Sequence, residues 1–178
     1  MNVINIHYSR TDFGELILGS FHDRLCLCDW RFRKMREAID KRIQEGLDAI
    51  YVESVSDVTQ NALEQLEGYF SGNRTDFDIT LLMVGSDFQK KVWNELLKIP
   101  YGSTESYLGL SGKIGDEKAI RSVAAANGAN ALSIFVPCHR IIGSDGKLTG
   151  YAGGLQVKRK LLQLEMVKDV PGQLPLFG

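Results

Sequence analysis

The chain has few of the residues that mark a secreted, disulfide-bonded or membrane-spanning protein. Only three of its 178 residues are cysteines, and two of them, Cys26 and Cys28, stand too close together in the sequence to form a favourable pair. We therefore expect reduced thiols and no disulfide framework. No apolar stretch approaches the roughly 20 residues that a membrane-spanning helix needs. The first residues, MNVINIHYSR, lack the basic start and apolar middle of a signal peptide. These absences predict a cytoplasmic protein.

Net charge is also nearly absent from the whole chain, but the charges are unevenly divided along it. Residues 1–87 carry 9 Lys+Arg against 15 Asp+Glu, whereas residues 88–168 carry 12 against 6. A basic half beside an acidic half is typical of a polyanion-binding module joined to a non-binding partner, because Lys and Arg make the phosphate contacts. A chance asymmetry of solvated faces explains the charge equally well.

Hydrophobic patterning in the first half predicts a small α/β domain over residues 1–84. The β-rich runs VINIHY, GELILGS, RLCLCDW and FDITLLM predict strands, and VTQNALEQLEGYF has helical spacing. The charge-rich segment 31–50 is either a surface helix or an elaborated loop. Cys26 and Cys28 are expected on one face of a strand as packing residues, so no metal site is predicted there.

The second half, residues 85–168, is predicted to be a mostly helical domain. Ser86 and Gln89 form a capping-box pattern at the start of an amphipathic helix. Two short helices follow, of which the first can end at Gly115 and the second can begin at Asp116. Two short helices joined in this way predict a helix-turn-helix. The predicted fold class is therefore α+β: a small N-terminal α/β domain with a β-sheet, followed by a mostly helical C-terminal domain containing a helix-turn-helix.

One face of the second short helix carries small side chains and a single long cation. These positions are Arg121, Ser122 and Ala125. Small side chains let a helix approach another surface closely, and a lone arginine on such a face could enter a nucleic-acid groove or take the place of a base. Considered alone, the segment is explained more simply by a solvated arginine on an alanine-rich helix.

The run SIFVPCHR is the strongest chemical feature of the sequence. Residues 134–136 predict a buried strand, Pro137 stiffens its exit, and Cys138 follows where the strand gives way to a loop. Thiolate is the nucleophilic form of cysteine, so a nearby base would help at neutral pH. His139 is a candidate base, but adjacent side chains point apart, and a bridging water would be needed. The alternative is a buried structural cysteine beside an unrelated histidine.

Four segments together resemble the methylated-DNA–protein-cysteine methyltransferases, a family that repairs 6-O-alkylguanine. They are FQKKVWNELLKIPYGSTESY, IGDEKAIRSVAAANGAN, VPCHRIIGSDGKLTGYAGGL and KRKLLQLE, in the order and spacing of the family. The resemblance implies irreversible, single-turnover transfer of an alkyl group from 6-O-methylguanine in double-stranded DNA to Cys138. It also implies 4-O-methylthymine as a second substrate, base flipping through a minor-groove helix-turn-helix, no cofactor, and a monomer.

The resemblance assigns roles to particular residues. Cys138 is the expected alkyl acceptor, His139 its water-mediated base and Glu165 the carboxylate that orients the imidazole, and together they are expected to lower the pKa of Cys138. Asn130 is expected to hold the adjacent turn, and Arg121 to fill the gap left by the flipped base. The remaining expected contacts are Tyr107, Asn127, Ile141, Tyr151 and Ala152 with the substrate, and Ser122 and Ala125 with DNA. Ala152 departs from the serine that is frequent in the family, so only its backbone N–H could help there.

Two other classes of function are alternatives to alkyl transfer. A non-catalytic binder of damaged DNA would not need Cys138, and a cysteine hydrolase would need a separate histidine that the chain does not suggest.

The tail, residues 169–178, contains QLPLF, which resembles the motif by which bacterial proteins dock onto the replicative sliding clamp. The residues that would dock are Gln173, Leu174, Leu176 and Phe177. A tail folded back on its own domain is the alternative.

Overall fold

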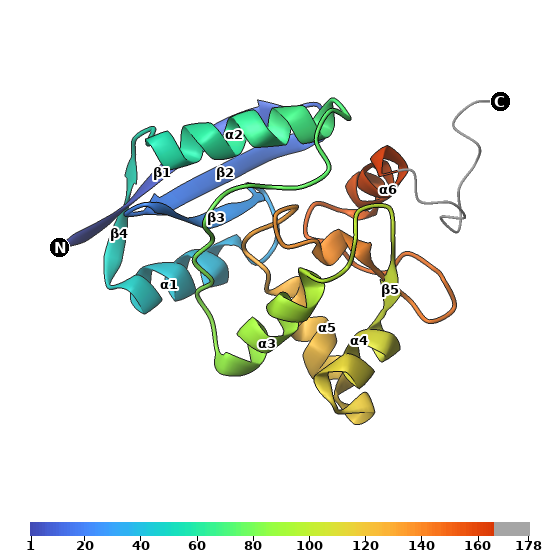
Figure 1. The fold of residues 1–178 in the computed structure, drawn as a ribbon. Helices are drawn as coiled ribbons and strands as arrows, with labels where there is room; N and C mark the ends of the chain where they lie inside the picture. Colours follow the sequence, from blue (N-terminus) through green and yellow to red (C-terminus); the bar gives the residue numbers. More distant parts are fainter. Residues whose placement is uncertain (166–178) are drawn as a thin grey trace.

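A four-stranded mixed sheet forms the centre of the N-terminal half in the computed structural model, which describes residues 1–165 (Figure 1). The spatial order of the strands is β3-β2-β1-β4, in which β2 is antiparallel to both β1 and β3, and β4 is parallel to β1. The strands are β1 (Asn2–Thr11), β2 (Gly14–Phe21), β3 (Arg24–Trp30) and β4 (Ala49–Glu53). The first three confirm the strands expected from VINIHY, GELILGS and RLCLCDW.

The strand predicted from FDITLLM does not form. Only one isolated bridge joins this segment to the sheet, where Leu25 N–H donates to the Thr80 carbonyl and Leu82 N–H donates to the Leu25 carbonyl. The fourth strand is instead β4, which was not predicted and begins at the end of the undecided segment 31–50. A single bridge cannot sustain a ladder, so residues 77–83 cross the sheet edge as irregular chain.

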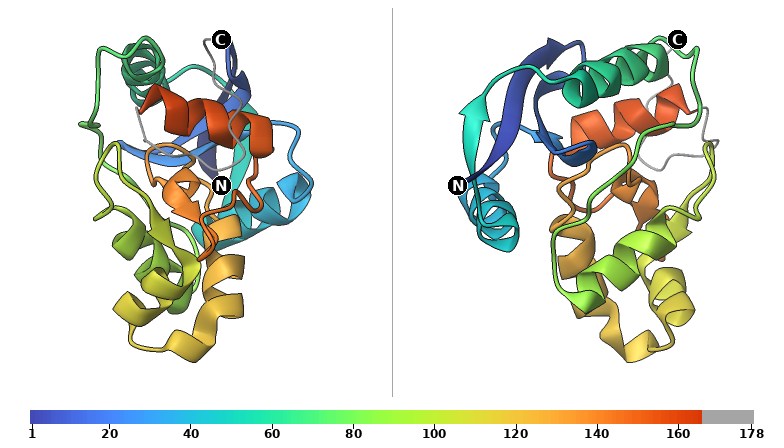
Figure 2. Two further views of the ribbon diagram at one scale, coloured as in Figure 1. Left: turned by 90° about the vertical axis from the view of Figure 1, so that its right-hand side faces the viewer. Right: turned by 60° about the vertical axis from the view of Figure 1, so that its left-hand side comes forward.

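Two helices cover opposite faces of this sheet (Figures 1 and 2). The helix α1 (Arg36–Leu47) packs Ile39 and Ile43 against one apolar cluster, and α2 (Asp57–Phe70) packs Ala62, Leu66 and Tyr69 into the other. The segment 31–50 is thus a loop, a helix and the start of a strand. Cys26 and Cys28 were predicted to share one face of a strand, and this prediction is wrong, because they lie in different clusters. An irregularity of register opposite Gly19 and Ser20 puts Cys26 in the α1 cluster and Cys28 in the α2 cluster.

The C-terminal half is mostly helical, as predicted, and its first three helices gather at the end of the molecule away from α2 (Figures 1 and 2). Both hydrogen bonds of the capping box between Ser86 and Gln89 are present, so the expected start of the helix is confirmed. The elements are α3 (Asp87–Leu96), β5 (Glu105–Ser106), α4 (Tyr107–Ile114), η1 (Glu117–Ala119), α5 (Ile120–Gly128), η2 (Cys138–Arg140), β6 (Ile141–Ile142) and α6 (Leu155–Leu164).

The expected pair of short helices is α4 and α5. Gly115 ends α4 in the left-handed conformation with a φ of 95°, which favours glycine, and the Asp116 carboxylate accepts from the Lys118 N–H at 2.9 Å. A single 3₁₀ turn, η1, separates this cap from α5. The α+β class with a helix-turn-helix is therefore confirmed. The domain boundary between residues 84 and 85 stays a prediction.

The predicted strand before the cysteine is wrong. Residues 129–137 form a looped segment in which Ile134 has a φ of 75°, a conformation that a β-branched residue rarely adopts. Its contact with the sheet is a short bridge, because Cys28 N–H donates to the Ala131 carbonyl and Ser133 N–H to the Cys28 carbonyl. The sequence pattern of a short, buried apolar run does not distinguish a strand from a tightly packed loop.

A buried ion-pair network fastens this looped segment to the N-terminal half. The Asp29 carboxylate, at the end of β3, accepts from the Ser133 hydroxyl at 3.1 Å and pairs with Arg33 and Arg36. Arg33 in turn donates to the carbonyls of Gly128 and Asn130. The two halves therefore share one polar joint next to Cys138.

None of the helices between residues 1 and 165 has the length and apolar character that crossing a membrane requires.

Candidate active site

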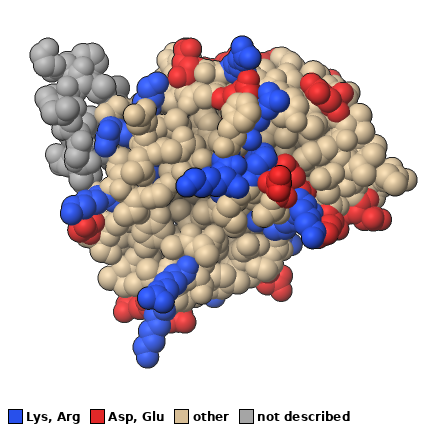
Figure 3. Space-filling view, turned by 180° about the vertical axis from the view of Figure 1, so that it is seen from behind, with Lys and Arg blue, Asp and Glu red and all other residues tan. Residues whose placement is uncertain are grey.

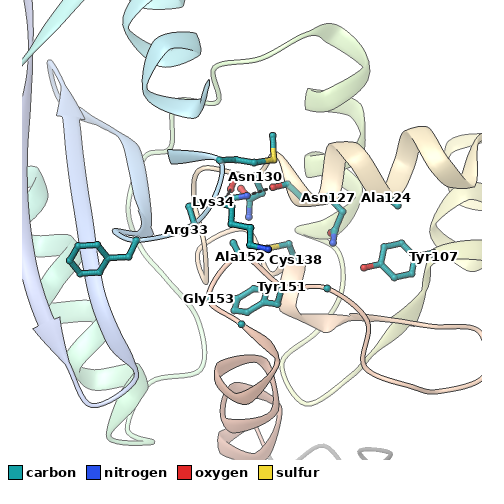
Figure 4. Close-up of a pocket in the computed structure, with 15 residues that line it drawn as sticks. Arg33, Lys34, Tyr107, Ala124, Asn127, Asn130, Cys138, Tyr151, Ala152 and Gly153 are labelled. Atoms are coloured by element: carbon teal, nitrogen blue, oxygen red, sulfur yellow. Dashed lines mark hydrogen bonds between the residues drawn. The ribbon is translucent and has the colours of Figure 1, made fainter. Parts of the chain in front are cut away.

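Cys138 opens the turn η2 and lies at the bottom of a hollow of about 710 Å³ between the two halves of the chain. The cysteine is only 3% exposed. Figure 4 shows the hydroxyl group of Tyr107 directed toward Asn127 and Cys138. A reactive thiol at the bottom of a hollow can meet only a group that enters it.

Asn130 shapes the chain that leads to the thiol. Its side-chain amide donates to the Val136 carbonyl at 2.9 Å, and its side-chain oxygen accepts from the Leu132 N–H at 2.9 Å. Both bonds are buried. One side chain thus ties both ends of the loop before Cys138, and this loop replaces the strand that the sequence suggested.

His139, the residue that follows the cysteine, forms a buried pair with Glu165. The His139 Nε2 atom lies 2.8 Å from Glu165 Oε1, and both side chains are fully enclosed. Glu165 is contributed by the residue that follows α6, 26 positions away in the chain. Helical spacing alone would have left this glutamate on the surface.

The Glu165 carboxylate is held ionised by a dense set of donors. Its Oε1 accepts from the Tyr69 hydroxyl at 2.7 Å and from Arg140 Nη2 at 2.9 Å, and its Oε2 accepts from Arg140 Nε at 2.9 Å. Burial raises the pKa of this carboxyl, but the hydrogen bonds from His139 and Arg140 and the charge of Arg140 outweigh burial and lower the pKa to about 2. Glu165 is therefore an anion at every physiological pH.

An ionised Glu165 fixes the tautomer of the histidine. Burial lowers the pKa of His139, so the neutral imidazole is favoured. Its single proton sits on Nε2, since only a donor can face the carboxylate. The Nδ1 atom is then an acceptor, and among residues 1–165 it has no hydrogen-bond partner. The pair presents a base at Nδ1.

The prediction that the pKa of Cys138 is lowered is wrong for the resting protein. Burial is the largest influence and raises the pKa, while the Asn130 side chain and the positive charge of Lys158 act in the opposite direction. The resting thiol is protonated at neutral pH. Its reaction therefore needs a proton acceptor when a substrate arrives.

Lys158 is a residue of this site that the sequence analysis missed. It is completely buried, and its ammonium donates to the carbonyls of Thr149 at 3.0 Å and Gly150 at 3.2 Å. Burial lowers its pKa to about 8. A lysine on the same helical face as Leu161 and Leu162 was the available signal, because a charge on an apolar stripe needs a reason.

The residues predicted to form the site divide into three groups. Six line the hollow: Tyr107, Asn127, Asn130, Cys138, Tyr151 and Ala152. Ile141 and the His139–Glu165 pair are buried outside its lining. Arg121, Ser122 and Ala125 are exposed on α5 and do not line the hollow.

The N-terminal half also contributes a wall of the hollow, which the sequence analysis did not foresee. The loop before α1 lines it through Phe32, Arg33, Lys34 and Met35. Phe32 is 78% exposed, an unusual state for a large aromatic side chain. No local pattern in the loop sequence indicates this placement, because it depends on how the two halves pack.

The charge asymmetry of the sequence does not appear as a uniform basic surface on the one face that Figure 3 draws. On the face drawn in Figure 3, Lys and Arg side chains are interspersed with Asp and Glu.

Within residues 1–165, no group of three or more His, Cys, Asp or Glu side chains lies close enough to bind a metal ion. Burial raises the pKa of Cys26 to about 12, and the pKa of Cys28 also rises.

The fold and the site together define an α+β protein with a helix-turn-helix and a buried cysteine beside a His–Glu pair. Residues 87–167 match the family model for the DNA-binding domain of 6-O-methylguanine DNA methyltransferase. The methylated-DNA–protein-cysteine methyltransferase of Mycobacterium bovis is 52% identical over 116 residues, which are 65% of this chain and 70% of that protein. The Mycolicibacterium paratuberculosis protein of the same name is 48% identical over 137 residues, covering 74% and 82%. The chain belongs to the methylated-DNA–protein-cysteine methyltransferase family.

Solved structures agree with this assignment over nearly the whole chain. The Mycobacterium tuberculosis O6-methylguanine methyltransferase superimposes with a TM-score of 0.77 at 36% identity, covering 98% of this chain and 99% of that one. Mycobacterium tuberculosis OGT in complex with DNA superimposes with a TM-score of 0.74 at 37% identity, covering 92% of each chain. The N-terminal half is thus part of the shared fold.

Proposed function

We propose that this protein repairs DNA by transferring the alkyl group of 6-O-methylguanine, and of 4-O-methylthymine as a second substrate, to the sulfur of its own Cys138. Membership of the family supports the activity, and the relative solved in complex with DNA supports the substrate. The single observation that carries the residue assignment is that Cys138 lines the hollow while His139, the next residue in the chain, forms a buried pair with Glu165.

The transfer requires one bond to form and one to break. As the substrate enters, the Cys138 proton passes to His139 Nδ1 through a bridging water, and Glu165 stabilises the imidazolium that results. The sulfur attacks the methyl carbon, the bond between this carbon and the guanine oxygen breaks, and a proton from the Tyr107 hydroxyl neutralises the leaving guanine. The product is a thioether. The site residues include no group that could cleave it, so each molecule acts once.

A damaged base must leave the duplex to reach this thiol. Cys138 is 3% exposed, and a stacked guanine cannot enter the hollow. Arg121, Ser122 and Ala125 lie exposed on α5, which suits close approach of this helix to a minor groove. Arg121 fills the space of the extruded base, while Asn127, Tyr151 and Ala152 border the base in the hollow.

The experiment that tests the function is intact-mass measurement after incubation with an oligonucleotide that carries 6-O-methylguanine. We expect a permanent gain of one methylene, mapped by peptide analysis to Cys138. Cys138→Ser is the matched variant, and it should bind the oligonucleotide without any gain in mass. Unchanged mass of the wild type with tight binding would support a damage binder, and many turnovers per molecule would support a hydrolase.

The remaining partner proposals concern residues outside the described part of the chain, or properties of the protein in solution. Docking onto a bacterial sliding clamp rests on Gln173, Leu174, Leu176 and Phe177, which all lie outside residues 1–165. Titration of purified clamp with the full chain and with a version ending at Gly172 tests it, since equal binding by both would remove the idea. A monomeric state and a cytoplasmic location complete the proposal.

A further inference from the structure

Tyr69, on the α2 helix of the N-terminal half, reaches the carboxylate behind the active cysteine. Its side chain is fully buried, and its hydroxyl donates to Glu165 Oε1 at 2.7 Å. The same oxygen faces His139 Nε2 at 2.8 Å. Tyr69 and Glu165 are 96 residues apart in the sequence. The N-terminal half therefore contributes a hydrogen bond to the pair on which the proposed proton transfer depends.

The packing around Tyr69 does not require its hydroxyl group. The ring lies against Phe70, Phe77 and Tyr101, with ring centroids 5.7, 5.5 and 6.2 Å away. A phenylalanine ring would keep all three contacts. The hydroxyl group acts instead on the carboxylate. A buried O–H requires an acceptor, and the acceptor of this one is the anionic Glu165.

The number of hydrogen-bond donors to Glu165 Oε1 affects how strongly the carboxylate stabilises a protonated His139. Each donor withdraws part of the negative charge of this oxygen, so each weakens the hold of the carboxylate on an imidazolium at His139. Without the Tyr69 hydroxyl, more of that charge would face His139. The charged and titratable groups around the pair are Tyr69 on α2, Tyr101 after α3, Cys138 and Arg140 in η2, Tyr151 before α6, and Lys158 on α6.

We propose that Tyr69 is a positioning residue of the alkyl-transfer reaction, which fixes the Glu165 carboxylate against His139 and sets how strongly the imidazole accepts a proton. The inference rests on the proposed function. It assigns to the N-terminal half a role in reactivity through a single hydroxyl group, in addition to its structural role.

The test compares Tyr69→Phe with Tyr101→Phe in single-turnover alkyl transfer across a range of pH. Tyr101 is a matched control, because its hydroxyl donates to the Leu164 backbone carbonyl at 3.1 Å rather than to the carboxylate. In Tyr69→Phe, the acid-side midpoint of the rate profile should rise by about half a pH unit to one unit, less than the full effect of one hydrogen bond to a charged group, because the lost donor acts on His139 only through the carboxylate. In Tyr101→Phe the midpoint should stay at the wild-type value.

A second substitution keeps the test valid if Tyr69→Phe does not fold. Tyr69→3-fluorotyrosine, introduced at this position alone, retains the hydroxyl and makes it a stronger donor. Its acid-side midpoint should move to lower pH, opposite to that of Tyr69→Phe. A purely structural role predicts no change of midpoint in either variant.

Each outcome has a definite meaning. A lower rate with an unmoved midpoint in Tyr69→Phe, equal shifts in the two phenylalanine variants, or no shift with fluorotyrosine would overturn the inference. Failure of the wild type itself to gain a methyl group would instead overturn the proposed function, which separates the two.

Discussion

The indole N–H of Trp30 donates to the hydroxyl oxygen of Tyr151 at 3.1 Å, which joins the last residue of β3 to the chain that borders the hollow. The buried ammonium of Lys158 also holds this stretch of chain, through the carbonyls of Thr149 and Gly150. Residues 149–151 are thus fixed by both halves of the protein. The shape of the hollow depends on contacts from outside its lining.

Replacing Lys158 should slow alkyl transfer. Lys158→Met removes two hydrogen bonds to the chain at residues 149–150 and a positive charge that favours the Cys138 thiolate, so the single-turnover rate at neutral pH should fall about tenfold, the effect of one pKa unit on the thiol. The control is Lys160→Met, because Lys160 is exposed on the same helix. An unchanged rate in Lys158→Met, measured by intact mass, would contradict this role.

The pH dependence of stability offers a second measurement on the same residue. The pKa of Lys158 is lowered to about 8, so between pH 8 and the ordinary lysine pKa the unfolded chain binds a proton that the native protein has lost. This difference makes the stability contribution of Lys158 rise with pH in that window. Buried Cys26 and Cys28 act in the opposite direction, because their raised pKa values keep protons on the native thiols. Lys158→Met should therefore lose stability more steeply above pH 8 than the wild type does.

Much of this site could be predicted because the segment around Cys138 is unusual in itself. A cysteine and a histidine after an apolar run, with a proline before them, indicate chemistry by residue type alone, and the family resemblance pointed to Glu165. Tyr69, Trp30 and the loop 32–35 could not be predicted. Their roles arise from the packing of the N-terminal half against the C-terminal half, and nothing in their local sequence reports a contact with residues about 100 positions away.

The errors in the predicted fold have a common physical origin. Residues 77–83 and 134–136 both have the composition of buried strands, yet each makes only isolated bridges. Burial selects the apolar residues, whereas a strand also needs a neighbour along its whole length. The edge of β3 is bridged by residue 81 at one point and by residue 132 at another, and residues 134–136 bridge only back to residue 133. The edge strand β4 was missed for the opposite reason, since several of its residues are exposed.

Glu165→Gln should slow the reaction and reduce stability at neutral pH. The substitution removes the anion that balances buried Arg140 and orients His139, and breaking a buried ion pair costs about 3–5 kcal/mol. The pKa of Glu165 is lowered to about 2, so its contribution is complete above the ordinary glutamate pKa and is lost as the pH falls toward 2. Urea unfolding at pH 7 and pH 4 should therefore show a smaller difference between variant and wild type at pH 4. Equal single-turnover rates for the two proteins would show that Glu165 takes no part in the proposed proton transfer from Cys138 to His139.

Asp29→Asn should loosen the joint between the two halves. Asp29 is completely buried and accepts from Ser133, Arg33 and Arg36. Its neutralisation leaves buried Arg33 without a carboxylate partner, whereas Arg36 keeps its ion pair with Asp40. We expect a loss of about 3–5 kcal/mol in the free energy of unfolding. The control, Asp23→Asn, changes an exposed carboxylate and should alter stability by less than about 0.5 kcal/mol. Similar losses in both variants would show that the joint does not depend on this network.

Arg121→Ala should impair extrusion of the damaged base from the duplex without impairing alkyl transfer from the base to Cys138. Arg121 is exposed on α5 and lies outside the hollow, so its removal should slow repair of duplex DNA while the reaction with free 6-O-methylguanine base continues at the wild-type rate. Lys118, exposed on the preceding turn, provides the control. Lys118→Ala should weaken binding to all duplexes alike and reduce the salt dependence of binding, as expected for a phosphate contact. Equal losses on duplex and free base in Arg121→Ala would instead place this arginine in folding or in the hollow, because only the duplex requires a side chain to replace the missing base.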